Sequence, residues 1–369
     1  GQLTMRLAYN LFTQKPKAEK DDFLNWTKTS KYKQGDDYFR HNGAGEMLVF
    51  SAADFEDFRQ PRPDMPEAME GELEDVVRIL AENRWPWRMH ATYDETISRA
   101  LDVFERVNRD IPLQGLNWFF DHAETISEQS IDRIAALGGG IAVQHRMAYQ
   151  GEYFVERYGA AAATATPPVA KMLEKGIKVS AGTDATRVAS YNPWVSLAWL
   201  ITGMTVGGMR LYPQRNCLDR ETALRMWTQY VTWFSNEEGK KGQLKVGQLA
   251  DLIVPSRDYF ACAENEIADM TSDLTIVGGK VVYAAGGFTP LDENPVPPAM
   301  PDWSPVRTFG GYAAWSDPTP ATMQQRHGCG CASSCGIHGH DHITAWSAKL
   351  PVSDLKSFWG ALGCACWAI

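Results

Sequence analysis

Hydrophobic residues recur along the chain with helix spacing and strand spacing in turn. Leu73, Val76, Val77 and Leu80 lie three or four residues apart, which is the spacing of one buried helix face. Short apolar runs typical of buried strands follow at residues 85–90, 116–122, 141–145 and 176–179. Strands alternating with helices of this length predict an α/β fold with a parallel sheet.

Helix boundaries are indicated by capping signals. Thr92 with Glu95 has the spacing of a capping box, which would open a helix that continues to Val107. Thr125 with Glu128 repeats this pattern, and Gly138 would end that helix. Further helices are expected near 168–175 and 195–200, and over 219–234 after the cap residue Asp219.

Earlier and intervening segments have weaker patterns. Residues 3–11 predict a strand, and the Asn42-Gly43 turn signal predicts strands on either side of it, at 38–41 and 47–50. Polar residues 13–37 are expected to form a solvent-exposed segment outside the core. The segment between residues 145 and 168 is expected to be a long loop, with no helix before residue 168.

The even repetition favours a partial TIM-type (β/α) barrel over residues 1–235. About six strands are expected there, whereas a closed barrel of this kind needs eight. Strands at 251–255 and 275–283 predict a small β-sandwich portion over 236–290. Residues 291–369 are expected to form a Pro/Gly-rich arm and a Cys/His-rich tail.

Composition and charge narrow the function classes. The 369 residues are 44% hydrophobic and 22% charged, with a net charge of −9. The acidic balance argues against a nucleic-acid surface, and no apolar run is long enough for a membrane span. A small-molecule substrate is expected, and a homo-oligomer is left open. With no visible secretory signal and seven cysteines, an odd number, a reducing, cytoplasmic location is predicted.

Four residues with metal-binding or acid–base chemistry end predicted strands. They are His90, His122, His145 and, after the run Val179-Ser180-Ala181-Gly182-Thr183, Asp184. Imidazoles and a carboxylate from successive strands converge at the mouth of a barrel, as a metal site requires. Alone, each histidine is better explained as a buried or substrate-facing residue, and Asp184 as a helix cap.

Longer motifs around these residues resemble a known family. The stretches Met89-His90-Ala91, Phe120-Asp121-His122-Ala123-Glu124 and Ser180-Ala181-Gly182-Thr183-Asp184 resemble the amidohydrolase superfamily, specifically its YtcJ-like amidohydrolase 3 branch. Residues 242–254 resemble the return of the chain into the small β-sandwich of that family. The resemblance covers about residues 1–287.

The resemblance implies a metal-dependent hydrolase acting on amide-type C–N bonds. His90 and His122 would bind one or two divalent ions, with zinc favoured, from the fifth and sixth barrel strands. Asp184, on the eighth strand, would bind metal and act as general base toward a metal-activated water. His145, on the seventh, would contact the substrate or support the oxyanion.

Parts of the family pattern are missing. No His-x-His pair occurs before Leu116, so the chain resembles the C-terminal part of a longer protein, and the activity of the isolated chain is left open. At the fourth-strand position, either His41 or Glu46 could supply the ligand.

The tail offers a second kind of metal site, built from Cys329, Cys331, Cys335, His338, His340 and His342. Incidental cysteines and a disulfide are the alternatives. An alternative function is therefore a non-catalytic metal-binding or redox-sensing protein that uses this tail.

Overall fold

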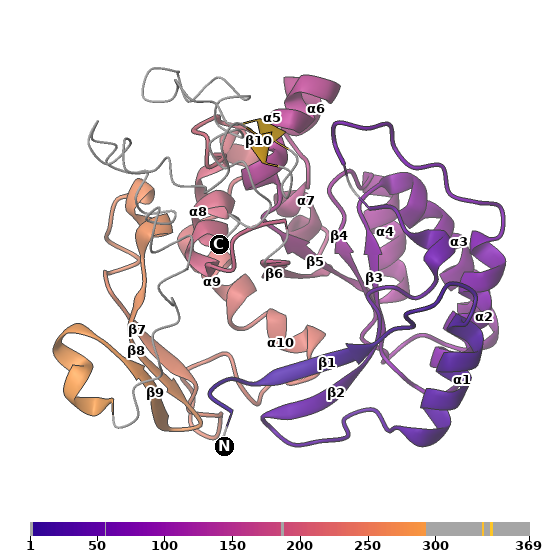
Figure 1. Ribbon diagram of the computed structural model, residues 1–369, viewed down its shortest axis with the longest axis horizontal. Coiled ribbons are helices and arrows are strands. Elements are labelled where there is room, and N and C mark those ends of the chain that lie inside the picture. The colour runs from indigo at the N-terminus through magenta and orange to yellow at the C-terminus, as the bar shows by residue number, and fades with distance from the viewer. Residues whose placement is uncertain (1–2, 56, 186–187, 293–333, 336–339, 342–369) are drawn as a thin grey trace.

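Parallel strands with helices on their outer side form most of the molecule (Figure 1). The structure is a computed structural model that describes residues 3–55, 57–185, 188–292, 334–335 and 340–341. The described strands are, in chain order, β1 (Leu7–Leu11), β2 (Phe39–Ala44), β3 (Arg88–Ala91), β4 (Phe119–His122), β5 (Gly140–Gln144), β6 (Lys178–Gly182), β7 (Leu252–Pro255), β8 (Ser272–Val277), β9 (Lys280–Ala284), β10 (Ser334–Cys335) and β11 (His340–Asp341).

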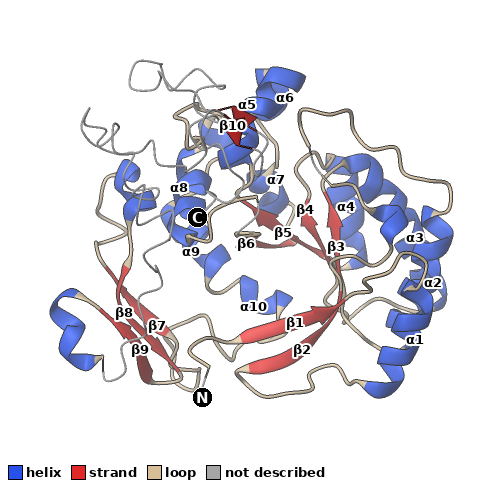
Figure 2. Cartoon of the chain, in the orientation of Figure 1, coloured by secondary structure: helices blue, strands red, loops and turns tan. Residues whose placement is uncertain are grey.

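Helices fill most of the connections between these strands (Figure 2). The described helices are α1 (Glu19–Thr29), α2 (Met69–Glu82), α3 (Asp94–Asp110), α4 (Glu128–Leu137), α5 (Met147–Tyr158), α6 (Ala160–Ala163), α7 (Val169–Glu174), α8 (Pro193–Thr202), α9 (Arg220–Trp227) and α10 (Val231–Phe234).

The first six strands follow one another in space as they do in the chain. β1 pairs with β2, and β3, β4, β5 and β6 form one sheet in that order, with every pairing parallel. A single parallel bridge between Ala44 and Trp87 connects β2 to the segment entering β3. The predicted mixed α/β fold with parallel sheets is confirmed, and the carboxyl ends of β3, β4, β5 and β6 lie at one edge of their sheet.

The helix faces expected from hydrophobic spacing form the core between strands and helices. Leu73, Val76, Val77 and Leu80 of α2 are fully buried, and the rings of Phe104 on α3 and Phe120 on β4 stack with centroids 5.6 Å apart. Such close packing of large side chains fixes each strand against its helix. The strand ends that carry the histidines therefore rest on a rigid support.

Asn42-Gly43 lies inside β2 and forms no turn, contrary to the prediction. Gly43 has φ = +119°, and a Cβ placed on it would be 2.1 Å from the carbonyl oxygen of Pro86. Glycine is needed at this position because the backbone of β2 comes so close to the segment entering β3. Residues 47–49 form no strand but lead into a single helical turn at Phe50–Ala52.

Both predicted capping boxes are wrong, although both helices exist. Helix α3 begins after Tyr93, which supplies no side-chain cap, and α4 is capped by Ser127, whose hydroxyl accepts from the amide of Ser130. The predicted caps at Gly138 and Asp219 are confirmed. The two amides just before α3 donate to a distant carboxylate, described below, and the first amide of α3 donates to the hydroxyl of Thr125, contacts that a local pattern cannot reveal.

Three further differences concern helices. The polar segment 13–37 contains α1, whose Phe23 is fully buried, and the predicted loop after residue 145 contains α5 and α6. The single helix expected over 219–234 is two helices, α9 and α10, separated by residues 228–230. In each case tertiary contacts, which the local pattern does not contain, decide the outcome.

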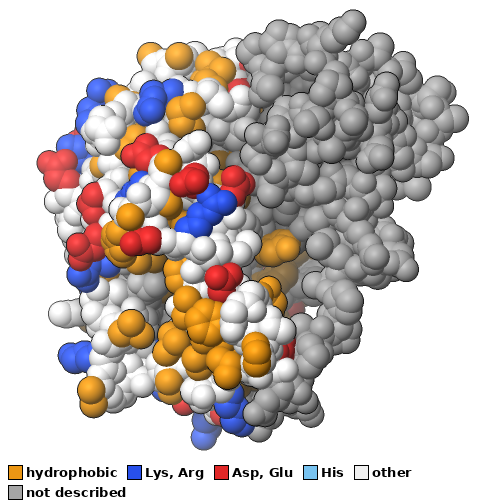
Figure 3. All heavy atoms as spheres, turned by 90° about the vertical axis from the view of Figure 1, so that its left-hand side faces the viewer, with side chains coloured by type: hydrophobic (Ala, Val, Ile, Leu, Met, Phe, Trp, Pro, Cys, Tyr) orange, Lys and Arg blue, Asp and Glu red, His pale blue; other side chains and the backbone are white. Residues whose placement is uncertain are grey.

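Strands β7, β8 and β9 form a separate antiparallel sheet. Among the described residues it has no second sheet packed on it, so the β-sandwich portion stays a prediction. Ile253 and Tyr283 of this sheet are exposed, and Figure 3 shows hydrophobic side chains gathered low on the face of the molecule that carries it. Arg6 binds Asp251 through two hydrogen bonds of 2.6 and 2.8 Å and so ties the sheet to the segment before β1.

None of the described helices combines the length and the apolar character that a membrane span requires.

Candidate metal centre

The inner face of β3 and β4 carries charged side chains near the strand ends. Side chains alternate along a strand, so Arg88 and His90 of β3 share one face. Arg88 donates two hydrogen bonds of 2.6 and 2.8 Å to Asp121 on β4, which places Asp121 on that same inner face. Across the β3–β4 ladder, His90 pairs with Asp121 and Ala91 with His122.

His122 should point outward by the same alternation, because Phe120 packs outward on α3. Its ring instead meets that of His90, with centroids 4.3 Å apart. The backbone explains the reversal: φ is +82° at His122 and +57° at Ala123, which non-glycine residues rarely adopt. Local strain therefore turns the imidazole of His122 inward, as is common at functional sites.

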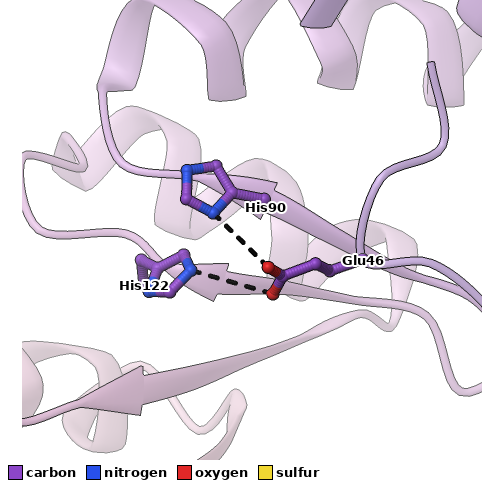
Figure 4. Close-up of side chains that lie close together, drawn as sticks. All are labelled: Glu46, His90 and His122. Carbon is purple, nitrogen blue, oxygen red and sulfur yellow. Dashed lines mark ion pairs between the residues drawn. The ribbon is translucent and has the colours of Figure 1, made fainter. Parts of the chain in front are cut away.

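Glu46 completes a cluster with the two histidines (Figure 4). The Glu46 Oε1 atom lies 3.9 Å from His90 Nδ1, and Oε2 lies 3.9 Å from His122 Nε2. One ligand atom from each residue lies within 4.8 Å of the other two, and both histidines are buried. Glu46 is reached from β2 through the close approach at Gly43 and Gly45, and its carbonyl accepts from the amide of His90.

Asp54 sets the orientation of His90. This carboxylate is fully buried and accepts hydrogen bonds of 3.0 Å from the amides of Thr92 and Tyr93, the two residues just before α3. His90 Nε2 lies 3.2 Å from Asp54 Oδ1. Because the carboxylate accepts a hydrogen bond from Nε2–H, the lone pair of a neutral His90 lies on Nδ1, the atom that faces Glu46.

Arg146 occupies the other side of His122. This side chain is buried, and its Nη2 atom lies 3.2 Å from His122 Nδ1 and donates to Asp184 Oδ2 at 3.1 Å. Its Nη1 atom donates to Glu124 Oε1 at 3.3 Å. Asp184 thus joins the site through Arg146, and its backbone φ of +53° is a second departure from ordinary geometry.

Burial and charge shift the pKa values of these groups in different directions. Burial, and then the nearby Asp121, raises the pKa of Glu46. Burial lowers the pKa of His90, but the hydrogen bond and charge of Asp54 outweigh it, so the net pKa is raised. Burial and the positive charge of Arg146 hold the pKa of His122 well below its usual value. The opposite charges of their partners, Asp54 and Arg146, therefore contribute to a difference in basicity between the two imidazoles.

The donor set fits a divalent cation. His90 Nδ1 and His122 Nε2 are buried and lack a hydrogen-bond partner among the described residues, and each faces one oxygen of Glu46. A buried polar atom needs a partner, and a cation shared with Glu46 would supply one to both nitrogens. Two imidazoles and a carboxylate are ligands that Zn²⁺ and related ions accept.

The other residues predicted for the site lie apart from this cluster. Both ring nitrogens of His41 contact backbone oxygens, those of Lys31 and Gly43, so Glu46 is the fourth-strand residue that meets the histidines. His145 is fully buried against the ring of Tyr149, and burial lowers its pKa to about 4.

The tail site lies almost entirely outside the described residues. Cys329, Cys331, His338 and His342 are not described, and for Cys335 and His340 the structure gives only the backbone of β10 and β11.

The sequence pattern did not select two residues of the centre, Asp54 and Arg146. Asp54 lies in a polar loop 36 residues before His90, and nothing local distinguishes it. Arg146 is the second residue after β5 and could have been noticed by the same strand-end argument that selected His145.

A groove of about 460 Å³ lies elsewhere, between α7, the start of β6 and the segment 229–243. It is at the opposite end of β6 from Asp184, and no residue of the cluster lines it.

Comparisons with curated proteins link the chain to amidohydrolases. It is 29% identical over 120 residues to the N-substituted formamide deformylase of Arthrobacter pascens, an alignment covering 32% of this chain and 22% of that protein. It is 21% identical over 234 residues to the putative amidohydrolase YtcJ of Bacillus subtilis (strain 168), covering 61% and 44%. The chain therefore matches less than half the length of each relative.

Solved structures show the same fold. An uncharacterized metal-dependent hydrolase from Pyrococcus furiosus aligns with a TM-score of 0.54 and 20% identity, over 70% of this chain and 52% of that one. A second, from Pyrococcus horikoshii OT3, gives 0.53 and 18%, over 69% and 52%.

The family model of the amidohydrolases matches residues 1–283, a span that includes every residue of the cluster and both of its flanking groups, Asp54 and Arg146. On this match over most of its length, and with a fold shared with metal-dependent hydrolases, the chain belongs to the amidohydrolase family.

Proposed function

We propose that this chain carries the metal centre of a hydrolase that cleaves an amide-type C–N bond in a small molecule. The observation that carries the proposal is the convergence of Glu46, His90 and His122 from three neighbouring strand ends, with unpartnered imidazole nitrogens facing one carboxylate. The hydrolase part is proposed to span residues 1–235, with 236–290 as a smaller β unit.

The ion is proposed to be divalent, with zinc favoured by two imidazole ligands. Bound there, it would supply Lewis-acid polarisation of a carbonyl oxygen and make water more acidic. Glu46, His90 and His122 would hold it, while Asp54 keeps the Nδ1 lone pair of His90 directed at it.

Asp184 is proposed as the general base. Its side chain is about one third exposed, so water and substrate can reach it, while Arg146 holds one of its oxygens in place. A carboxylate in this position can take a proton from the attacking water and pass it to the amine that leaves. The buried Arg146 orients Asp184 and counters its charge.

The substrate class is drawn from a relative. The curated relative from Arthrobacter pascens is named as a deformylase of N-substituted formamides. An N-acyl amine of a small molecule is therefore the substrate class that we propose for this chain.

The test is hydrolysis of a panel of N-substituted formamides and acetamides by the full chain, supplied with Zn²⁺, Co²⁺ or Mn²⁺. Release of the free amine should depend on the ion. Replacing Asp184 by Asn should lower kcat by about 10²-fold or more while the ion stays bound. The exposed cap residue Asp219 provides a matched control, since Asp219→Asn should leave kcat unchanged. Equal kcat for Asp184→Asn and the unaltered chain would remove Asp184 from the mechanism.

A further inference from the structure

The two imidazoles of the centre have partners of opposite character on the side away from Glu46. His90 faces a carboxylate, Asp54, at 3.2 Å, and His122 faces a guanidinium, Arg146, at the same distance. An ionised carboxylate accepts hydrogen bonds but donates none, and an arginine donates hydrogen bonds but accepts none. In the neutral rings, His90 therefore carries its proton on the nitrogen that faces away from Glu46. His122 carries its proton on the nitrogen that faces Glu46.

For His90, the arrangement suits an ion. The proton on Nε2 belongs to the hydrogen bond with Asp54, so a lone pair remains on Nδ1, which faces Glu46. In the neutral ring, no proton has to move before Nδ1 can bind a cation.

For His122, the arrangement opposes an ion. Arg146 donates to Nδ1, so a neutral ring carries its proton on Nε2, which is the nitrogen that faces Glu46 at 3.9 Å. A nitrogen that carries a proton has no lone pair for a metal. Binding an ion at Nε2 would move the proton to Nδ1, and Arg146 would then have no acceptor on this ring.

Arg146 has other acceptors. It donates to Asp184 at 3.1 Å and to Glu124 at 3.3 Å, and both carboxylates are available if the contact with His122 opens. Burial of Arg146 and Glu124 keeps the guanidinium within the site in either arrangement.

We propose that Arg146 is an internal cation that competes with a divalent ion for His122, so that the ion binds only when the contact between Arg146 and His122 opens. The inference rests on the proposed metal centre and identifies the residue that sets its ion affinity. His90 is then the ligand prepared in advance, and His122 the ligand released by the movement of Arg146.

The first test is the affinity for Zn²⁺, measured by competition with a chelator on the full chain. Replacing Arg146 by Met would remove the positive charge beside the buried Glu124, so the informative pair is Glu124→Gln alone against Glu124→Gln with Arg146→Met. The double variant should bind Zn²⁺ at least about 10-fold more tightly, because a fixed positive charge and a competing donor are both removed. Equal or weaker binding would overturn the proposal.

The second test needs no ion. Nitrogen NMR of the metal-free chain, labelled with ¹⁵N-histidine and assigned with His122→Gln, reports which ring nitrogen carries the proton. We expect the Nε2–H form for His122 and a hydrogen-bonded, unprotonated Nδ1. The Nδ1–H form would overturn the proposal even if the zinc affinities differ.

The two tests separate this inference from the proposed function. If the single and the double variant bind Zn²⁺ equally well, the metal centre stands and the competition is wrong. If no form of the chain binds an ion, the metal centre is wrong and the inference falls with it.

Discussion

Asp54 links the backbone just before α3 to the orientation of a ligand. Its carboxylate accepts from the amides of Thr92 and Tyr93 and from His90 Nε2. Replacing Asp54 by Asn keeps an acceptor for the amides but no longer stabilises the His90 proton with a charge. We expect Asp54→Asn to weaken Zn²⁺ binding by about 10–100-fold, measured by chelator competition.

A cap without a ligand role is the control for Asp54. Asp219 caps α9 by accepting from the amide of Thr222, far from the centre in sequence. Asp219→Ala should lower the free energy of unfolding by about 1 kcal/mol and leave Zn²⁺ binding unchanged. Equal losses of Zn²⁺ affinity in the two variants would mean that Asp54 acts only through helix stability.

At the residue scale, the sequence contains enough to select the histidines but not their partners. His90 and His122 could be predicted because each ends an apolar strand, and strand ends meet at one edge. Glu46 could be named only as one of two choices, since backbone geometry at Gly43 and Gly45 decides that it reaches the histidines. Asp54 could not be predicted, because the contact with His90 is made across 36 residues of chain.

At the scale of elements, strand β2 depends on glycine at position 43. Ala at that position would place its Cβ 2.1 Å from the Pro86 carbonyl oxygen, at a φ of +119°. We expect Gly43→Ala to lower the free energy of unfolding by about 1–3 kcal/mol or more in urea titration, because strand and neighbouring segment must separate.

Gly71 in α2 is the matched substitution. A Cβ there would meet no atom within 4 Å, and the backbone is helical. Gly71→Ala should therefore stabilise the chain by about 0.5–1 kcal/mol. A similar loss from both substitutions would show that the contact at Gly43 is not the cause.

Elements with a strong repeating pattern were predictable, and those held by distant contacts were not. Helices α2 and α3 were predicted because their apolar residues repeat every three or four positions over several turns. Helix α1 and the break between α9 and α10 depend on what the rest of the molecule places against them. Strand β2 likewise continues through Asn42-Gly43 because of a contact distant in sequence, the close approach of Gly43 to Pro86.

At the scale of the whole molecule, the β7–β9 sheet is held to the parallel strands in part by Arg6 and Asp251. The hydrogen bonds from Arg6 lower the pKa of Asp251 below its ordinary value. A carboxylate with a lowered folded-state pKa stabilises the fold above its unfolded pKa and loses this contribution as pH falls through the folded value.

The resulting prediction is a pH-dependent difference between the chain and its Asp251→Asn variant. The unaltered chain should be the more stable near neutral pH, and the difference should shrink below about pH 4, as the carboxylate becomes protonated. Urea titrations at a series of pH values measure it. A difference that stays constant down to pH 3 would show that the charge of Asp251 contributes nothing.

The central claim is that Glu46, His90 and His122 bind one divalent ion together. The most direct measurement is the zinc content of the purified full chain after dialysis, by elemental mass spectrometry, for the unaltered chain, His122→Ala and His41→Gln. His41 is the control because it is a buried histidine with both nitrogens on backbone oxygens. The account predicts that His122→Ala holds about one zinc per chain less than the unaltered protein and His41→Gln, whatever the cysteines and histidines of the tail bind. Equal zinc in all three proteins, or none in the unaltered chain, would contradict it.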